Sequence, residues 1–272
     1  MRKPTNLLLL LTAILLINLT ASAAEIKRIV SLAPSLTKNI RYLESEDLLV
    51  GCTSYCQPVQ KTEIVASAVK VNIEKVVTLK PDLVIATTIT NGETIENLRK
   101  FGIRVEVYPT AHSFNDICSQ FLELGKLIGR EEQATKVING SRQKVEQLRK
   151  SVADEMKQKM FIQIGANPLY TVLTNTFMDD YITFSGCLNI ASDLSIGTIT
   201  RENVLLRNPD VIFVVTMGIV GEEEKFNWEK IKELNATKNK KIFIIDSDKA
   251  CTPTPVTFTE TLETIINLTY TK

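Results

Sequence analysis

The side chains with the most distinctive chemistry in this sequence are five cysteines and one histidine. They are Cys52, Cys56, Cys118, Cys187, Cys251 and His112. A zinc site is disfavoured, because the C-x3-C pair at positions 52 and 56 has no second pair at ligand spacing and one histidine cannot complete a ligand set. We therefore expect no metal site formed by the protein alone, and we interpret the histidine as a loop residue without a specific role.

Sequence motifs of the common enzyme classes are absent. The chain has no G-x-G-x-x-G, no G-x-x-x-x-G-K-[ST], no G-x-S-x-G and no nucleophile beside a plausible histidine. The cysteines are too scattered to hold an iron–sulfur cluster. These observations predict a protein that is not an enzyme, with no catalytic residues and no cofactor.

The first 23 residues have the pattern of a secretory signal peptide. Arg2 and Lys3 precede an apolar run from Leu7 to Leu19, and Ala21-x-Ala23 offers a cleavage site. The apolar run is short for a membrane span. The alternative is a signal anchor that stays uncleaved. No cysteine lies near the cleavage point, so a lipoprotein anchor is disfavoured and we expect a periplasmic protein.

Disulfides are permitted in the periplasm. Cys52 and Cys56 are near enough in the chain to bridge if the loop between them bends, and the alternative is two small, partly buried thiols. Because the number of cysteines is odd, at least one is free or pairs between chains.

Length and charge place few limits on the mature chain. Removal of residues 1–23 leaves 249 of the 272 residues, enough for one large or two modest domains. Without Arg2 and Lys3, the 32 basic residues fall to 30 against 31 acidic ones, with no long run of one sign. The composition therefore excludes a charge-driven nucleic-acid binder.

Short apolar runs typical of buried strands alternate with segments of helical pattern. The runs cover residues 28–32, 48–50, 83–86 and 104–107 in the first half of the chain, and 160–164, 211–215 and 241–245 in the second. Such alternation predicts an α/β fold with parallel sheets covered by helices.

The chain also contains an internal repeat. Residues 77–86 (VTLKPDLVIA) are echoed by residues 205–214 (LLRNPDVIFV), at an offset of 128 positions. In each copy a proline blocks the continuation of a short helix, an aspartate begins a tight turn, and a buried strand follows. The repeat predicts two α/β units in tandem.

Residues 131–158 separate the two units. Apolar residues recur there at three- and four-residue steps, which indicates one long amphipathic helix. Gly140 weakens this helix, and the alternative is two helices with a turn at that position. The expected organisation is a signal peptide (1–23), an N-terminal lobe (24–130), a linker helix (131–158) and a C-terminal lobe (159–272).

Five segments together resemble the family of periplasmic vitamin B12-binding proteins, which are solute-binding proteins with a helical backbone between lobes. They are RIVSLAPS (28–35), VGCTSY (50–55), NIEKVVTLKPDLVIA (72–86), NPLY (167–170) and TRENV (200–204). The resemblance covers essentially the whole mature chain. It implies two Rossmann-like lobes joined by one long helix, the class III periplasmic binding protein fold, acting as a monomer in an ABC importer.

The resemblance implies that Glu74 and Glu202 dock onto the permease. In this family each lobe presents one surface glutamate to arginine pockets on the permease dimer, which works with its ATPase subunits. The two glutamates are 128 positions apart, the offset of the internal repeat. A carboxylate and a guanidinium can form a bidentate pair that sets register. The alternative is two ordinary solvated glutamates at helix N-termini.

The ligand is expected between the lobes, in loops that follow the carboxyl ends of strands. The candidate residues are Pro34, Ser35, Tyr55, Ala68, Val69, Lys70, Thr87, Thr88, Asn167, Pro168, Tyr170, Ile199 and Asp248. By the resemblance, Tyr55 and Tyr170 occupy positions of aromatic wall residues. The alternative for each tyrosine is a structural, half-buried aromatic.

A corrinoid such as cobalamin is the first expectation for the ligand. Where the family places tryptophans, this chain aligns Ala68, Thr87 and Ile196, so the cleft is less aromatic. Haem, with a tyrosine as axial ligand, and ferric siderophores, with Lys70 or Lys249 in the cleft, are the alternatives. We expect the helical linker to permit only slight closure of the lobes.

Overall fold

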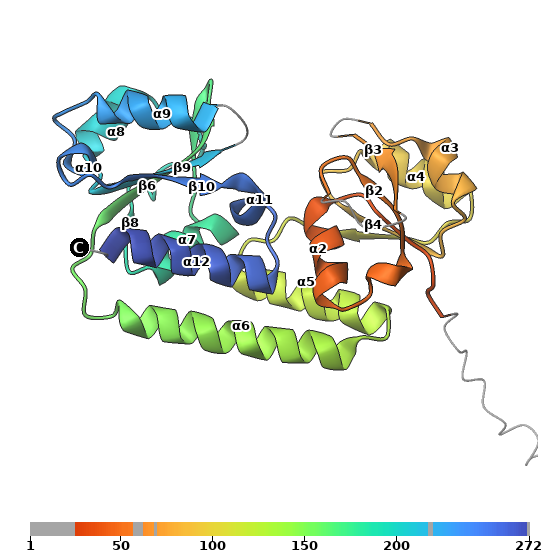
Figure 1. Cartoon of the computed structure of the whole chain (residues 1–272). Helices are drawn as coiled ribbons and strands as arrows, with labels where there is room; N and C mark the ends of the chain where they lie inside the picture. The colour runs from red at the N-terminus through yellow and green to blue at the C-terminus, as the bar shows by residue number, and fades with distance from the viewer. Residues whose placement is uncertain (1–24, 57–61, 68–69, 217–219, 271–272) are drawn as a thin grey trace, which may run out of the picture.

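The computed structural model describes residues 25–56, 62–67, 70–216 and 220–270. They form two α/β lobes that stand side by side on a long helix (Figure 1). The segment expected to be a signal peptide, residues 1–23, lies outside the described residues. Among the helices of the described part, none combines the length and the apolar character that a membrane span needs.

The N-terminal lobe is built on a fully parallel sheet with the strand order β3-β2-β1-β4-β5. Its strands are β1 (Ile29–Ser31), β2 (Leu49–Thr53), β3 (Glu63–Ala66), β4 (Leu83–Thr87) and β5 (Val105–Tyr108). Its helices are α2 (Pro34–Tyr42), the 3-10 helix η1 (Glu46–Leu48), α3 (Ile73–Thr78) and α4 (Gly92–Lys100). Helix α2 with η1 connects β1 to β2, α3 connects β3 to β4, and α4 connects β4 to β5, as the crossovers of a parallel sheet require.

The C-terminal lobe has a mixed sheet in the order β10-β9-β6-β7, with β8 also pairing with β6. Its strands are β6 (Lys159–Ala166), β7 (Leu169–Thr171), β8 (Leu188–Asn189), β9 (Val211–Thr216) and β10 (Ile242–Asp246). Its helices are α7 (Phe177–Phe184), α8 (Arg201–Arg207), α9 (Val220–Glu229), α10 (Asn235–Lys238), α11 (Ser247–Ala250) and α12 (Pro255–Tyr270).

The seven expected strands are present, but the sheets contain three more. The additional strands are β3, β7 and β8, all too short to give a clear periodicity. The expected parallel sheets are confirmed, and β7 adds a strand that runs antiparallel to β6. Only Asn167 and Pro168 connect these strands, and a two-residue connection reverses the chain rather than carrying it across the sheet.

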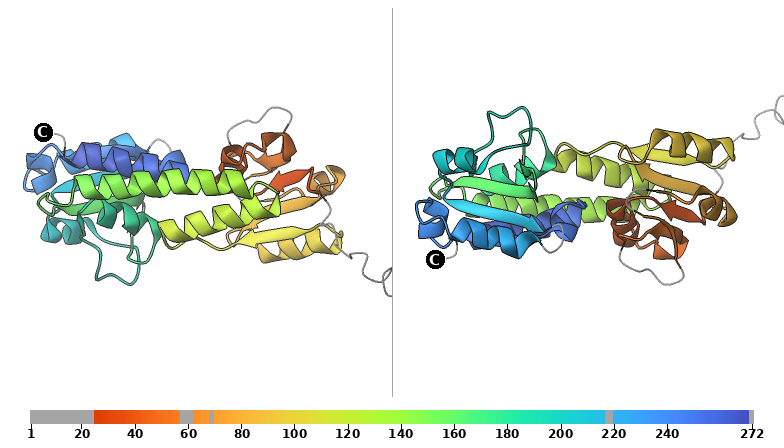
Figure 2. Two further views of the ribbon diagram at one scale, coloured as in Figure 1. Left: turned by 90° about the horizontal axis from the view of Figure 1, so that it is seen from below. Right: turned by 90° about the horizontal axis from the view of Figure 1, so that it is seen from above.

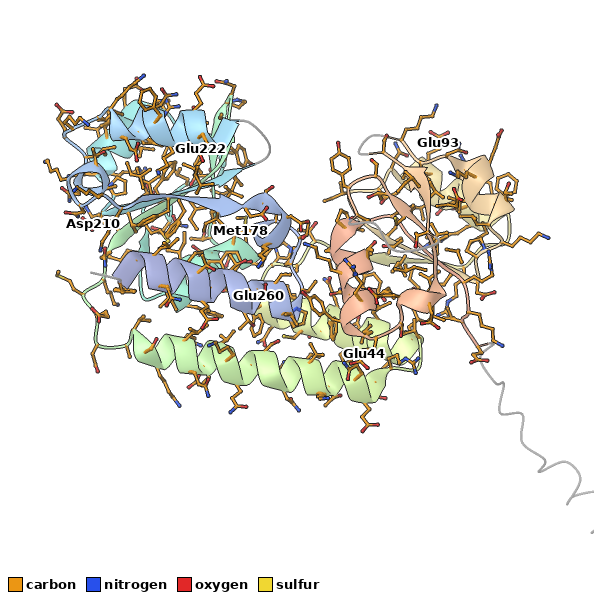
Figure 3. All side chains as sticks on the ribbon, in the orientation of Figure 1. Glu44, Glu93, Met178, Asp210, Glu222 and Glu260 are labelled. Atoms are coloured by element: carbon orange, nitrogen blue, oxygen red, sulfur yellow. The ribbon has the colours of Figure 1, made fainter. Side chains whose placement is uncertain are left out.

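The internal repeat corresponds to the same hydrogen-bonded frame in both lobes. In the first copy Asp82 N donates to Arg28 O at 2.9 Å, and Arg28 N donates to Asp82 Oδ2 at 2.9 Å. In the second, Asp210 N donates to Lys159 O at 2.8 Å and Lys159 N to Asp210 Oδ2 at 2.9 Å (Figure 3 shows Asp210 at the outer edge of its lobe). Each aspartate therefore fixes the register of two central strands, β1 with β4 and β6 with β9.

One helix crosses from lobe to lobe without a break. It is α6 (Glu131–Ser151), which continues through Gly140, so the alternative of two helices is not found. The helix ends at Ser151 rather than at residue 158. There Ser151 Oγ donates to Leu148 O at 2.7 Å, and Val152 turns into the core while Met156 is 83% exposed.

Two further helices accompany α6. Helix α5 (Phe114–Leu127) packs against it under the N-terminal lobe, and α12 packs against both (Figure 2). The hydrophobic core is continuous across this joint, from Ile29 and Ile40 through Phe121 and Val145 to Ile265. The helical linker is therefore a layer of three helices with a shared core, and not a single strut.

Gly125 and Gly140 offer a matched test of this layer. A Cβ at Gly125 of α5 would lie 2.6 Å from the Cβ of Ala134 in α6, whereas one at Gly140 meets nothing within 4 Å. We expect Gly125→Ala to destabilise the protein by about 1–3 kcal/mol through overpacking. We expect Gly140→Ala to stabilise it by up to about 1 kcal/mol. Urea unfolding would measure both, and a neutral Gly125→Ala would contradict the close helix contact.

Candidate functional site

Two adjoining cavities lie between the lobes. One has a volume of about 440 Å³ and is lined mainly by the N-terminal lobe, and the other, of about 610 Å³, is lined by both lobes. They share Pro34, Tyr55, Cys251 and Thr252. We call the two together the cleft. Their combined size is in the range of small-molecule sites, at the carboxyl ends of strands β1, β2, β4 and β10.

Tyr55 is the most prominent side chain of the cleft. It follows β2 in a turn in which Cys56 N donates to Thr53 O at 3.1 Å and Tyr55 N to Thr53 Oγ1 at 3.3 Å. Its side chain lines both cavities and is 63% exposed. An exposed aromatic ring at the mouth of a cavity offers a flat apolar face and a hydroxyl group to a ligand.

Most of the other expected residues of the N-terminal lobe also line the cleft. Pro34 and Ser35 begin α2 directly after β1, and Thr87 ends β4. Lys70 also lines the cleft, and its carbonyl oxygen accepts a hydrogen bond from Ser67 N at 3.0 Å. Thr88 lies beyond the lining, where its N donates to Tyr108 O at 3.0 Å. Ala68 and Val69 lie outside the described residues.

The C-terminal lobe contributes chiefly α11 and the residues around it. Asp246, Ser247, Asp248, Cys251 and Thr252 line the larger cavity. Burial, and then the nearby Asp246 carboxylate, raise the pKa of Cys251 to about 11, so its thiol is neutral at physiological pH. This wall therefore presents hydroxyl, thiol and carboxylate groups but no aromatic ring.

The expected residues around β7 have different surroundings. The Tyr170 ring covers Gly197, where an added Cβ would lie 2.3 Å from two ring atoms, and it remains 41% exposed. Asn167 and Pro168 form the turn before β7. Ile199 is instead buried in the hydrophobic core of its lobe with Phe161 and Val204. Because its side chain points into this core, Ile199 does not form a wall of the cleft.

Sequence analysis missed part of the lining, namely Thr53, Ile89, Thr90, Asn91, Thr94, Asp246 and Ser247. Four of these lie in the β4–α4 connection or the first turn of α4, just beyond the expected Thr87. Extending each strand end by a few residues would have found them, because the whole connection follows a carboxyl end.

An ion pair between the lobes closes the floor of the cleft. Lys38 Nζ, on α2, lies 2.9 Å from Asp248 Oδ2 and donates to Asp248 O at 2.5 Å and to Thr252 Oγ1 at 2.7 Å. An ammonium group has three donors, so all three have partners here. The Lys38 side chain is 11% exposed. Asp248 therefore belongs to the floor, with its carboxylate already engaged.

Glu74 and Glu202 occupy equivalent places on the outer sides of the lobes. Each lies in the first turn of a short helix, α3 or α8, and Figure 1 shows where these helices lie. Each glutamate side chain is exposed. Hydrogen bonds from its own backbone N–H and from Thr200 lower the pKa of Glu202. Because both side chains are exposed, both carboxylates are accessible to a partner.

The basic residue beside each glutamate is paired elsewhere. Lys75 Nζ lies 2.8 Å from Glu63 Oε2 of β3, and Arg201 Nη2 lies 2.6 Å from Glu224 Oε2 of α9. These pairs hold α3 and α8 to their lobes. Among the described residues, neither Glu74 nor Glu202 forms an ion pair with the cation beside it.

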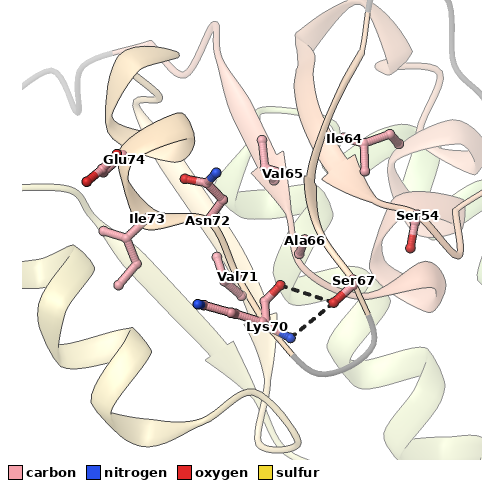
Figure 4. A pocket seen from close by; sticks show the side chains of 10 residues that line it. All are labelled: Ser54, Ile64, Val65, Ala66, Ser67, Lys70, Val71, Asn72, Ile73 and Glu74. Carbon is pink, nitrogen blue, oxygen red and sulfur yellow. Dashed lines mark hydrogen bonds between the residues drawn. The ribbon is translucent and has the colours of Figure 1, made fainter.

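A third cavity, of about 720 Å³, lies beside Glu74 on the outer side of the N-terminal lobe. Figure 4 shows it between β3 and the start of α3, with Ile64, Val65 and Ile73 along it and Glu74 at one end. It shares Ala66, Ser67, Lys70 and Val71 with the smaller cavity of the cleft, so it adjoins both the expected ligand site and the expected docking residue.

Residues 29–249 match the family model of the periplasmic binding proteins. An uncharacterised ABC transporter substrate-binding lipoprotein, YvrC of Bacillus subtilis, is 31% identical over 238 residues, covering 82% of this chain and 74% of the relative. A vitamin B12-binding protein of Vibrio vulnificus is 28% identical over 250 residues, covering 90% of each chain.

Solved structures share the two-lobed fold. The periplasmic vitamin B12-binding protein BtuF of Vibrio cholerae superimposes with a TM-score of 0.75 at 27% identity, covering 91% of this chain and 99% of that one. The periplasmic haem-binding protein HutB of Vibrio cholerae gives 0.81 at 20% identity, covering 89% and 98%. The second likeness supports the fold alone.

Replacing Lys38 tests the ion pair at the cleft floor. We expect Lys38→Met to lower the free energy of unfolding by about 2 kcal/mol, because it removes hydrogen bonds from a charged, largely buried group. Lys126→Met is the control, since Lys126 pairs with Glu131 at 3.4 Å and the two side chains are 53% and 62% exposed. That change should stay within about 0.5 kcal/mol. Equal losses in urea unfolding would contradict a special role for Lys38.

Proposed function

The chain belongs to the periplasmic binding protein family, and from this we propose that it is the solute-binding component of an ABC importer that holds a corrinoid between its lobes. The observation that carries the proposal is the cleft, which both lobes line and in which Tyr55 is exposed. The relatives named as vitamin B12-binding proteins support the choice of ligand.

The chemistry of the cleft suits a corrinoid. A corrin ring is flat and apolar on its faces and carries amide groups on its rim. Tyr55 and Ile89 offer apolar contact for the faces. Hydroxyl and amide groups of the N-terminal lobe offer neutral hydrogen-bond partners for the rim. They belong to Ser35, Thr53, Ser67, Thr87, Thr90, Asn91 and Thr94.

The charged residues of the cleft disfavour an anionic siderophore. Among the described residues that line the cleft, Lys70 is the one cation. Lys249 does not add to it, because its Nζ lies 3.1 Å from Glu260 Oε2 on α12. Asp246 would repel a negatively charged chelate, whereas the charge of Asp248 is balanced by Lys38.

Haem remains the second candidate, because the Tyr55 hydroxyl is placed where it could ligate an iron atom in the cleft. The Tyr55 hydroxyl group distinguishes the two candidate ligands. A corrinoid needs the Tyr55 ring, whereas haem needs the phenolic oxygen.

The docking role rests on the paired carboxylates. Glu74 and Glu202 occur at the same place in the repeated frame, each exposed and each beside a cation that is paired elsewhere. Two such carboxylates, one per lobe, match a partner with two arginine sites. Docking would hold the cleft in a fixed orientation to the permease.

The ligand-binding prediction uses Tyr55→Ala and Tyr55→Phe. We expect purified protein to bind cyanocobalamin saturably, and Tyr55→Ala to weaken binding about tenfold, a loss of roughly 1.4 kcal/mol. Tyr55→Phe should change corrinoid binding little. Phe101→Ala is the control, because that side chain is also 63% exposed but lies outside the lining of the cleft.

Absorbance titration against cyanocobalamin, cobinamide, haem and a ferric siderophore panel provides the measurement. Binding of haem alone, abolished by Tyr55→Phe, would establish the second candidate and reject the corrinoid. Binding of none of these compounds would reject both.

The docking prediction uses Glu74→Ala and Glu202→Ala. Each change should weaken the complex with the cognate permease by about 2 kcal/mol or more, because it leaves an arginine unpaired. Ligand binding should not change. Glu93→Ala and Glu222→Ala are matched controls, since both glutamates also lie in the first turn of a helix and are exposed (Figure 3). Uptake into proteoliposomes measures the effect. Import that survives both changes would show that docking does not depend on Glu74 and Glu202, whereas no import with the parent protein would indicate a receptor that never meets a permease.

A further inference from the structure

Cys52 and Cys56 flank the turn that carries Tyr55. Cys52 lies in β2 and is 1% exposed, and Cys56 closes the turn and is 7% exposed. Both sulfurs are free thiols in this structure and share a side-chain hydrogen bond. Cys56 also lines the larger cavity of the cleft. The two thiols are therefore in contact, and one of them borders a space that small molecules can reach.

The surroundings of the two sulfurs differ. Cys56 Sγ lies 3.1 Å from Thr37 Oγ1 on α2 and 3.3 Å from Thr53 Oγ1. The hydrogen bond with Cys52, followed by those with the two threonines, lowers the pKa of Cys56 to about 6 against the opposing effect of burial. The same contact raises the pKa of Cys52. Cys56, which accepts these contacts and borders the cleft, is therefore the thiol of the pair that loses its proton more readily.

The other cysteines lack this combination of features. Cys251 also lines the cleft, but burial raises its pKa. Burial likewise raises the pKa of Cys118 and of Cys187. Both lie in the interior of the protein, Cys118 on α5 and Cys187 after α7, and no sulfur–sulfur contact involves them within the described part of the chain. A metal site does not explain the pair either, because the described residues contain no group of three or more candidate ligands.

We propose that Cys52 and Cys56 form a reversible disulfide that fixes the Tyr55 turn of the cleft. The oxidant is a disulfide, either a small molecule such as oxidised glutathione or a thiol–disulfide oxidoreductase. The Cys56 thiolate attacks one oxidant sulfur and releases the other as a thiolate. Cys52 then loses its proton and attacks Cys56 Sγ, which releases the second thiolate. Two protein thiols are oxidised and the one oxidant disulfide is reduced to two thiols.

The bond would act on the turn itself. It closes a short loop in which Cys56 N already donates to Thr53 O, so the turn itself is formed before oxidation. Oxidation replaces the hydrogen bond between the sulfurs by a covalent bond and restricts residues 53–55 in every unfolded or open state. Tyr55 would then be held at the mouth of the cleft before any ligand arrives.

Thiol counting tests the bond without any ligand, so its result is independent of the proposed function. The full protein is equilibrated with oxidised glutathione, denatured, and treated with a thiol reagent. We expect three reactive thiols, two fewer than the five cysteines of the sequence, and all five after reduction. Peptide mapping should find Cys52 and Cys56 in one cross-linked peptide. Five reactive thiols in the oxidised sample, or a cross-link elsewhere, would overturn the proposal.

Serine variants and hydrogen exchange test the effect on the turn. In the parent protein, the amides of Tyr55 and Cys56 should exchange more slowly after oxidation than after reduction. In Cys52→Ser and Cys56→Ser the exchange should be the same in both conditions. Cys118→Ala, which alters a buried cysteine outside the pair, should behave like the parent. Equal exchange in oxidised and reduced parent protein would show that the bond does not fix the turn.

Discussion

The continuous apolar core that joins the lobes determines how the cleft can behave. Phe258 of α12 stacks on Phe114 of α5 with ring centroids 4.6 Å apart, and on Tyr181 of α7 at 4.5 Å. Wide separation of the lobes would expose these rings, and burial of each aromatic side chain is worth about 1.5–3 kcal/mol. The lobes are therefore held at a nearly fixed distance, and movement is confined to small rotations that keep the core closed.

A polar layer covers this core where it meets the cleft. Lys38 joins α2 to α11 there, and Tyr42, Lys249 and Glu260 line a further cavity behind it. A buried lysine with three oxygen partners tolerates little displacement, because each lost partner leaves a charged donor unsatisfied. The apolar core resists separation and the ion pair resists sliding. Together they present a preformed cleft, which reduces the ordering cost of capturing a rigid ligand.

The sequence predicted those features that depend on local pattern. Buried strands, the repeat at 128 positions and the cleft residues after β1, β2 and β4 follow from apolar runs and their ends. Features set by tertiary context were missed or misplaced. Strands β3, β7 and β8 are too short for a periodic signal, and the end of α6 depends on Val152 entering the core. The contact of Lys38 with Asp248, 210 positions away, has no local signature at all.

The two copies of the repeat agree in their frames and differ in their cleft walls. Asp82 and Asp210 make the same hydrogen bonds, and Glu74 and Glu202 follow the same helix starts. By contrast, Tyr55 and most of the hydroxyl groups come from one lobe, and the acidic α11 comes from the other. A partner with two similar sites requires equivalent carboxylates, whereas an asymmetric ligand requires unlike walls. In the proposed function, the repeated frame carries the docking residues and the loops carry the ligand-binding residues. A different ligand would therefore require changes in the loops and not in the frame.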